Sequence, residues 1–264
     1  MTNKYWMTFQ QSWQNGLAYP LSFALWRIRQ VLSTLMSLAV WMVIFSQNQT
    51  VFGYDQSSMI SYIFLVSILQ GAIIATSLNG LASDIYSGTV SQLFIKPVNI
   101  FKYLLAQEFA DKGRNLLLIC LETSVLWLIF KPSLHWPGLA ILGLTILWTI
   151  MGVIINFLVQ ILFGTLGFWS PESWGPRFLF YVIVDATAGK LFPLNIFPKL
   201  VQDLLFLTPF PYLSYVQTQL FLDKLSSIEV LKISGGMIFW TILLVLVVSR
   251  IWRHGIKNYS ASGQ

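Results

Sequence analysis

The chain has 264 residues, of which 56% are hydrophobic, 16% aromatic and only 10% charged. Soluble domains usually carry about 25% charged residues, so this composition excludes both a water-soluble globular protein and a disordered chain. The net charge of +6 does not indicate nucleic-acid binding, because in a membrane protein the position of basic residues matters more than their sum. We therefore expect an all-α integral membrane protein whose apolar spans have about 20 residues each.

The first 30 residues predict an amphipathic helix that lies in the membrane interface. Aromatic residues such as Trp6, Trp13 and Trp26 alternate with Gln, Ser, Asn and Arg, which is typical of interfacial helices. The stretch lacks the apolar core of a cleavable signal peptide. Arg27 and Arg29 are expected to form the cationic flank of the first span.

Six apolar segments predict six transmembrane helices, at residues 31–46, 59–80, 115–130, 139–163, 178–192 and 233–252. An even number of spans places both termini on one side of the membrane. We assign the termini and the loops 81–114 and 164–177 to the cytoplasm, because basic residues concentrate in cytoplasmic segments. Of the 16 basic residues, this assignment leaves outside only Lys131, Lys190, Lys199, Lys224 and Lys232.

The cytoplasmic loop 81–114 is too long for a simple turn. Its apolar residues Ile85, Val90, Leu93 and Phe94 predict one side of a short helix. Pro97 should end this helix, because proline lacks a backbone donor and disfavours a helical conformation in the residue before it.

The segment between the last two spans, residues 192–222, is apolar but contains four prolines, namely Pro193, Pro198, Pro209 and Pro211. Such a segment does not belong in bulk water, and the prolines exclude one continuous helix. We predict short re-entrant helices that dip into the outer leaflet and are shielded by other protein. An ordinary extracellular loop is the alternative.

Polar residues inside the spans are candidates for a transport path. Glu122 and Asp185 are ionisable residues in predicted spans, where a charge is costly and must face protein or a water-filled cavity. Each either lines a path or is a structurally paired carboxylate. For Glu122 we favour a structural pair with an Asn, Gln or Thr of a neighbouring helix. Gly71 and Ala75 either allow close helix packing or line the same path.

Motifs for catalysis are absent from the sequence. A phosphate-binding loop needs G-x-x-x-x-G-K-[ST], and the nearest segment, at Gly189 and Lys190, lacks the first glycine and the hydroxyl. His135 and His254 lie in separate loops without an H-E-x-x-H helix, which excludes a zinc protease. We therefore expect a chain that is not an enzyme and holds no metal or cofactor.

Three segments resemble the permease subunits of ABC-2 type exporters, especially the viologen and drug-export branch. Residues 87–98 (SGTVSQLFIKPV) are similar to the family's G-x-L-x-x-L-L-x-K-P-V segment, and residues 167–172 (GFWSPE) are similar to its F-W motif. The third segment contains Phe192-Pro193-Leu194, Phe197-Pro198 and Thr208-Pro209-Phe210 and resembles the family's gate region. Val90, Phe94 and Thr208 depart from the commoner leucines.

The resemblance implies a single transmembrane domain over residues 1–264, in a bacterial plasma or inner membrane. Two permease chains, identical or related, would form the path, and separate ATPase subunits would bind ATP and Mg²⁺. Residues 1–30 would be the elbow helix, and residues 193–222 the gate, with Pro193, Pro198, Pro209, Phe210 and Pro211. The loop 81–114 would contact the ATPase through a coupling helix, with Asp84, Ser87, Gly88, Thr89, Leu93, Phe94, Lys96 and Pro97.

Two alternatives remain. An ion-coupled secondary transporter would use Asp185 and Glu122 as ion or proton sites, but such transporters contain internal repeats, and the first three spans have no counterpart of the proline-rich region. An intramembrane enzyme would use the same carboxylates as an acid and base, without a supporting motif. The substrate is not indicated by the sequence.

Overall fold

The computed structural model describes residues 4–18, 20–132, 136–170 and 172–257, and this part of the chain is mostly helical. An all-α membrane protein is thus confirmed. A small hairpin of β1 (Thr50–Val51) and β2 (Tyr54–Asp55) follows the first long helix. The α-helices are α1 (Lys4–Asn15), α2 (Pro20–Gln47), α3 (Gln56–Ile73), α4 (Leu81–Tyr86), α5 (Ser91–Ile95), α6 (Ile100–Phe130), α7 (Leu139–Thr165), α8 (Trp174–Thr187), α9 (Lys199–Phe206), α10 (Tyr215–Phe221) and α11 (Ser227–Lys257). The 3₁₀ helices are η1 (Leu78–Gly80), η2 (Leu166–Phe168), η3 (Leu194–Ile196) and η4 (Phe210–Leu213).

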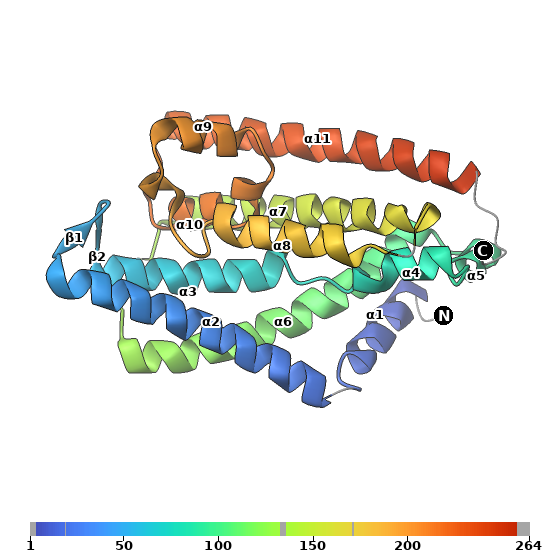
Figure 1. The fold of residues 1–264 in the computed structure, drawn as a ribbon, viewed down its shortest axis with the longest axis horizontal. Coiled ribbons are helices and arrows are strands. Elements are labelled where there is room, and N and C mark those ends of the chain that lie inside the picture. The colour runs from blue at the N-terminus through green and yellow to red at the C-terminus, as the bar shows by residue number, and fades with distance from the viewer. Residues whose placement is uncertain (1–3, 19, 133–135, 171, 258–264) are drawn as a thin grey trace.

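Five helical segments of the described residues are long and apolar enough to cross a membrane. They match the first, second, third, fourth and sixth predicted spans and extend along the molecule (Figure 1). The start of α1 and the end of α11 lie at one end of the body, together with α4 and α5, whereas the hairpin and α9 lie at the other (Figure 1). The segments are Ala24–Gln47, Gln56–Ile73, Ile100–Phe130, Leu139–Phe168 and Ser227–Lys257.

The predicted fifth span, residues 178–192, differs from the structure. Its helix, α8, has 14 residues and is therefore about 21 Å long, shorter than a hydrocarbon core of about 30 Å. The helix ends because Gly189 adopts φ of +84°, a conformation that glycine reaches without strain. The carbonyls of Ala188 and Gly189 accept hydrogen bonds from Ser214 Oγ and Tyr62 Oη, both at 2.6 Å.

Two predicted boundaries also differ. Residues 20–30, predicted as part of the interfacial helix, belong to α2. Residues 100–114, predicted as part of the cytoplasmic loop, form the first half of α6. This helix starts at Ile100, shortly after Pro97, because the Asn99 side chain accepts a hydrogen bond from the backbone N–H of Lys102 at 3.1 Å, which caps the helix N-terminus.

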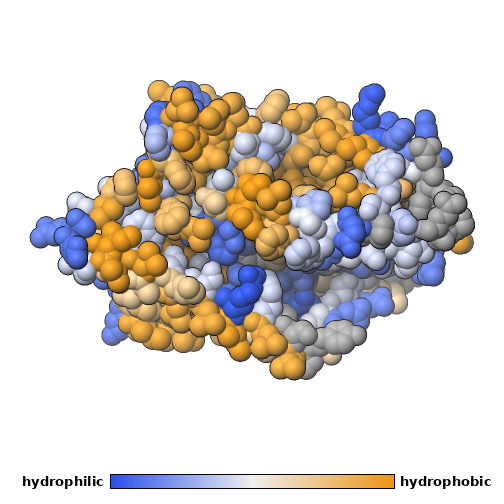
Figure 2. Space-filling model, in the orientation of Figure 1, coloured by the Kyte–Doolittle hydropathy of each residue, from blue (hydrophilic) through white to orange (hydrophobic). Residues whose placement is uncertain are grey.

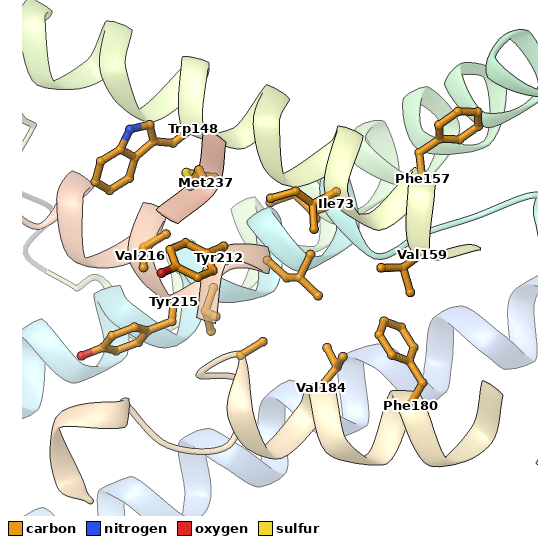
Figure 3. Packing of buried hydrophobic residues seen from close by; sticks show 14 of the residues in the cluster. Ile73, Trp148, Phe157, Val159, Phe180, Val184, Tyr212, Tyr215, Val216 and Met237 are labelled. Atoms are coloured by element: carbon orange, nitrogen blue, oxygen red, sulfur yellow. The ribbon is translucent and has the colours of Figure 1, made fainter. Parts of the chain in front are cut away.

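The apolar core lies around α7, where α3, α8, η4, α10 and α11 meet (Figure 3). Ile73, Trp148, Val184, Tyr212 and Met237 come from five different elements and are all buried. Since lipid tails are as apolar as these side chains, close packing is the main source of cohesion in a membrane. The core therefore fixes the positions of α3 and α8, which line the cleft described below.

The proline-rich segment forms the predicted short helices. Pro193, Pro198 and Pro209 directly precede η3, α9 and η4, and Pro211 lies in the first turn of η4. Proline is tolerated at these positions because the first N–H groups of a helix have no internal partner. Every residue of α10 is buried, and Gln217 Nε2 donates to the carbonyls of Tyr212 and Trp148 at 2.8 and 3.2 Å.

Candidate functional site: a polar cleft and the end that carries α4 and α5

A polar cleft of about 570 Å³ lies between α2, α3, α6 and α8. Figure 2 shows hydrophilic surface in the middle of this face, with apolar surface on either side. Gly71, Ala75 and Asp185, three of the four predicted path residues, line the cleft, and Glu122 does not. The structure thus brings together residues that are more than 100 positions apart in the sequence.

Most of the charged groups in the cleft are paired. Asp185 accepts a hydrogen bond from Lys190 Nζ at 3.1 Å, and Asp111 forms an ion pair with Arg114. Asn115 Nδ2 also donates to Asp111 Oδ2 at 3.1 Å. These pairs make the cleft hydrophilic without a large net charge.

Glu122 pairs with a cation and not with the amide or hydroxyl that the sequence led us to expect. Arg27 Nε donates to Glu122 Oε1 at 2.7 Å, and Arg27 Nη2 donates to Oε2. Arg27 is only 7% exposed, so it is not the free cationic flank of the first span. The fork of an arginine fits both oxygens of a carboxylate, and this pair joins α2 to α6.

We expect Arg27→Gln to lower the free energy of unfolding by about 1.5–3 kcal/mol, because it removes charge-assisted hydrogen bonds and leaves Glu122 without its cation. The matched control is Arg29→Gln, an exposed arginine on the same helix, which should change stability by less than about 0.5 kcal/mol. Thermal unfolding in detergent measures both, and equal melting temperatures for the two variants would contradict the assigned pair.

The second spanning segment is interrupted between α3 and η1, at residues 74–77. Lys112 Nζ donates to the carbonyls of Ile73 and Ala75 at 2.6 and 2.5 Å. Glu108 Oε2 accepts from the N–H of Ser77 at 3.1 Å and from Thr76 Oγ1 at 2.9 Å. Lys112 Nζ and Glu108 Oε1 also form an ion pair, at a distance of 3.2 Å. One turn of α6 therefore satisfies the backbone groups that the interruption leaves unpaired.

Arg177 supports the same region from α8. Its Nη1 donates to the Leu78 carbonyl at 3.0 Å and to Asn79 Oδ1 at 2.9 Å. The side chain is buried, and its guanidinium lies 5.9 Å from the ring centroid of Phe163. Arg177 was predicted as a loop cation, yet it connects α8 to η1.

The predicted helix at residues 84–94 is divided into α4 and α5 by a turn at Gly88. Gly88 has φ of +80°, and its N–H donates to the Ile85 carbonyl at 3.1 Å. The exposed hydroxyls of Ser87 and Thr89 lie 2.9 Å apart beside it. Asp84 is in the last turn of α4, and partial desolvation raises the pKa of its carboxyl.

The remaining predicted coupling residues follow the turn. Leu93 is half-buried, Lys96 and Pro97 are exposed, and the Phe94 side chain lies outside the described part of the structure. Lys4 Nζ donates to the Pro97 carbonyl, and Tyr5 Oη accepts from the N–H of Asn99 at 3.2 Å. The α1 helix is thereby attached to the segment after α5.

The F-W segment packs against α4. A Cβ atom at Gly167 would overlap with the backbone of Ala82, and one at Gly164 would overlap with the Leu81 side chain. Phe168 in turn packs on Trp252 of α11, with ring centroids 5.5 Å apart. The α4 helix therefore packs on the end of α7 and on η2, and η2 connects it to α11.

A family model described as ABC-2 family transporter protein matches residues 31–263. The chain belongs to the ABC-2 transporter family. A search among curated proteins finds no match. Membership and the apolar helices identify a multi-pass membrane component of an ABC transporter, with a transport role and not a catalytic one. The viologen and drug-export branch stays a prediction.

In this ABC-2 chain, the five predicted gate residues lie in or directly before η3, α9 and η4. Pro193 and Pro211 are buried, Pro198 is exposed, and Pro209 and Phe210 are half-buried. The Phe210 ring packs on Phe180 of α8, with centroids 6.1 Å apart. The hairpin is attached to this region because Asn195 Nδ2 donates to the Phe52 carbonyl at 3.2 Å.

Sequence reasoning missed Arg27, Glu108, Lys112 and Arg177. All four are buried and make polar contacts between helices. The signal was present for Glu108 and Lys112, which are four residues apart, the spacing of neighbours on a helix surface. Placing residues 100–114 in a loop concealed it.

Proposed function

We propose that this chain is the membrane-spanning permease subunit of an ABC exporter. Two such chains, identical or related, form the translocation path, and separate ATPase subunits bind ATP and Mg²⁺ and drive the cycle. The observation that carries the proposal is the α4–Gly88–α5 turn, which lies at the same end of the molecule as α1 and the end of α11 (Figure 1). We assign this end to the cytoplasm, in agreement with the positive-inside rule.

The coupling role of the turn is supported by its attachments. The α4 helix continues from η1, whose carbonyl at Leu78 is held by Arg177 of α8. It also packs on η2, which is connected to α11 through Phe168 and Trp252. An ATPase that displaces the exposed residues Ser87 and Thr89 therefore acts on several spans together, as in rigid-body transitions between packed helices.

The translocation path is assigned to the polar cleft. Gly71, Ala75 and Asp185 line it, and hydrophilic groups in a membrane must face protein or a water-filled cavity. The cleft is open on the side of α2 and α8 (Figure 2). A second permease chain against this face would close it, which supports a path at the interface between two chains.

The gate is assigned to the short helices after α8. Among them α10 is fully buried, and its Gln219 Nε2 donates to Tyr54 Oη of the hairpin at 2.8 Å, whereas α9 has no buried residue. The ion-coupled alternative is not favoured, because both of its carboxylates are paired with basic side chains, Glu122 with Arg27 and Asp185 with Lys190.

The test is co-purification of the tagged full-length chain from the membranes of its native host in mild detergent. We expect mass spectrometry to identify an ATPase with a phosphate-binding loop. Ser87→Arg combined with Thr89→Arg should abolish its recovery, because both exposed side chains flank the turn. Gln49→Arg combined with Thr50→Arg, exposed at the opposite end, should not. Absence of an ATPase contradicts the function, and equal recovery with both double variants contradicts the coupling assignment.

A further inference from the structure

An apolar groove of about 610 Å³ runs along α2 and joins the polar cleft at Arg29. It is lined mainly by Leu32, Met36, Val40 and Trp41 of α2 and by Phe192. Arg29 lines both the groove and the cleft. From Arg29 to Val40 the groove follows α2 for about 16 Å, at 1.5 Å per residue. The polar cleft and the apolar groove thus meet at the Arg29 side chain.

Two hydrogen-bond donors in the cleft have no partner among the described residues. Gln70 is 5% exposed, and its Nε2 makes no hydrogen bond. The Arg29 guanidinium likewise makes no ion pair or hydrogen bond with any residue that the structure describes, whereas Lys190 and Arg114 are paired with Asp185 and Asp111. Gln70 Nε2 is an unpaired buried donor, which costs free energy. The exposed Arg29 guanidinium lines the same cleft and carries a charge that no described acid neutralises, so a bound anionic acceptor at this point is favourable.

We propose that the cleft and the groove together bind one anionic amphiphile. Its carboxylate or phosphate accepts hydrogen bonds from Arg29 and Gln70, and its hydrocarbon chain lies in the groove along α2. Arginine suits this role because its planar fork matches the geometry of carboxylate and phosphate groups. That the bound amphiphile is a transport substrate rests on the proposed export function, whereas its binding needs no ATPase.

The charges favour this class over a cationic amphiphile. With Asp111 and Asp185 neutralised by Arg114 and Lys190, the remaining charge in the cleft is the positive charge of Arg29. A cationic headgroup would meet this charge and would have to displace a basic partner to reach either carboxylate. A neutral amphiphile would leave the arginine without a counterion.

The test is equilibrium binding of radiolabelled tetradecyl phosphate to the purified full-length chain in nanodiscs of neutral lipid. Arg29→Gln should weaken binding about tenfold or more, because a charge-assisted hydrogen bond is lost. Arg29→Lys should restore most of the affinity by keeping the charge. Gln70→Leu should weaken binding by a smaller factor. Arg250→Gln, an exposed arginine of α11 outside both cavities, is the matched control and should bind as wild type.

Competing compounds separate the parts of the ligand. Tetradecyltrimethylammonium and tetradecanol should compete poorly. Inorganic phosphate should also compete poorly, because it has no hydrocarbon chain to lie in the groove. Full competition by inorganic phosphate would show that the site binds free anions and would overturn the proposal of an amphiphile. Wild-type binding by both Arg29→Gln and Gln70→Leu, or equal competition by the cationic compound, would overturn the proposal. If the chain binds tetradecyl phosphate but shows no ATPase-dependent export, the proposed binding site is supported and the proposed export function is contradicted.

Discussion

Lys112→Met is expected to lower the free energy of unfolding by about 3–5 kcal/mol, the cost of removing one partner from a buried ion pair. The Lys112 side chain is 7% exposed and that of Glu108 is 1% exposed. Methionine fills the space but leaves a buried carboxylate and the carbonyls of Ile73 and Ala75 without their cation. The effect exceeds that of a surface lysine because water does not replace the lost contacts.

The measurement is thermal unfolding in detergent, followed by the loss of monodisperse protein. Lys102→Met is the matched control, since Lys102 lies on the same helix and is exposed. Adding Glu108→Gln to Lys112→Met should recover part of the loss, because it removes the unpaired charge. A melting temperature for Lys112→Met equal to that of Lys102→Met would show that this pair does not stabilise the interrupted segment.

Gly88→Pro is expected to reduce ATP-dependent export at least tenfold while the protein still inserts. Proline fixes φ near −65°, whereas Gly88 has φ of +80° and donates its N–H to Ile85. The turn between α4 and α5 must therefore rearrange. The spans do not contain this turn, so membrane insertion should be unchanged.

Export is measured with an amphiphilic dye that the wild-type complex exports, alongside ATP hydrolysis and the amount of membrane protein. Gly88→Ala is the control, because alanine tolerates a positive φ at a cost of about 1–2 kcal/mol, and it should keep most of the export. Hydrolysis that continues without export in Gly88→Pro would support coupling through this turn. Undiminished export would exclude the turn from coupling.

The sequence predicted the long helices well because hydropathy depends on local composition. The fourth span, predicted at residues 139–163, matches α7 at Leu139–Thr165. The short helices after α8 were also predicted correctly, because prolines favour the first turn of a helix. The end of α8 was missed, since the turn at Gly189 depends on contacts with Tyr62 and Ser214, which are remote in sequence.

The cleft was predicted only in part. Asp185, Gly71 and Ala75 were chosen from their positions in spans, and they share one cavity. Arg27 and Lys112 were interpreted as flanking or loop cations, since the positive-inside rule counts basic residues without regard to burial. The structure buries both against acidic partners on α6. The Arg27–Glu122 pair joins two helices and is a tertiary property that no local pattern of this single sequence reveals, whereas the Lys112–Glu108 pair lies within α6 at a spacing of four residues.

The interruption at residues 74–77 has a mechanical consequence. An unbroken helix passes an axial push along its length as a stiff rod does. Here the helix is interrupted between α3 and η1. The backbone groups that the interruption leaves without helical partners are hydrogen-bonded to Glu108 and Lys112 of α6. We therefore expect a displacement of α4 to bend the segment at residues 74–77, where the contacts of Glu108 and Lys112 connect it to α6.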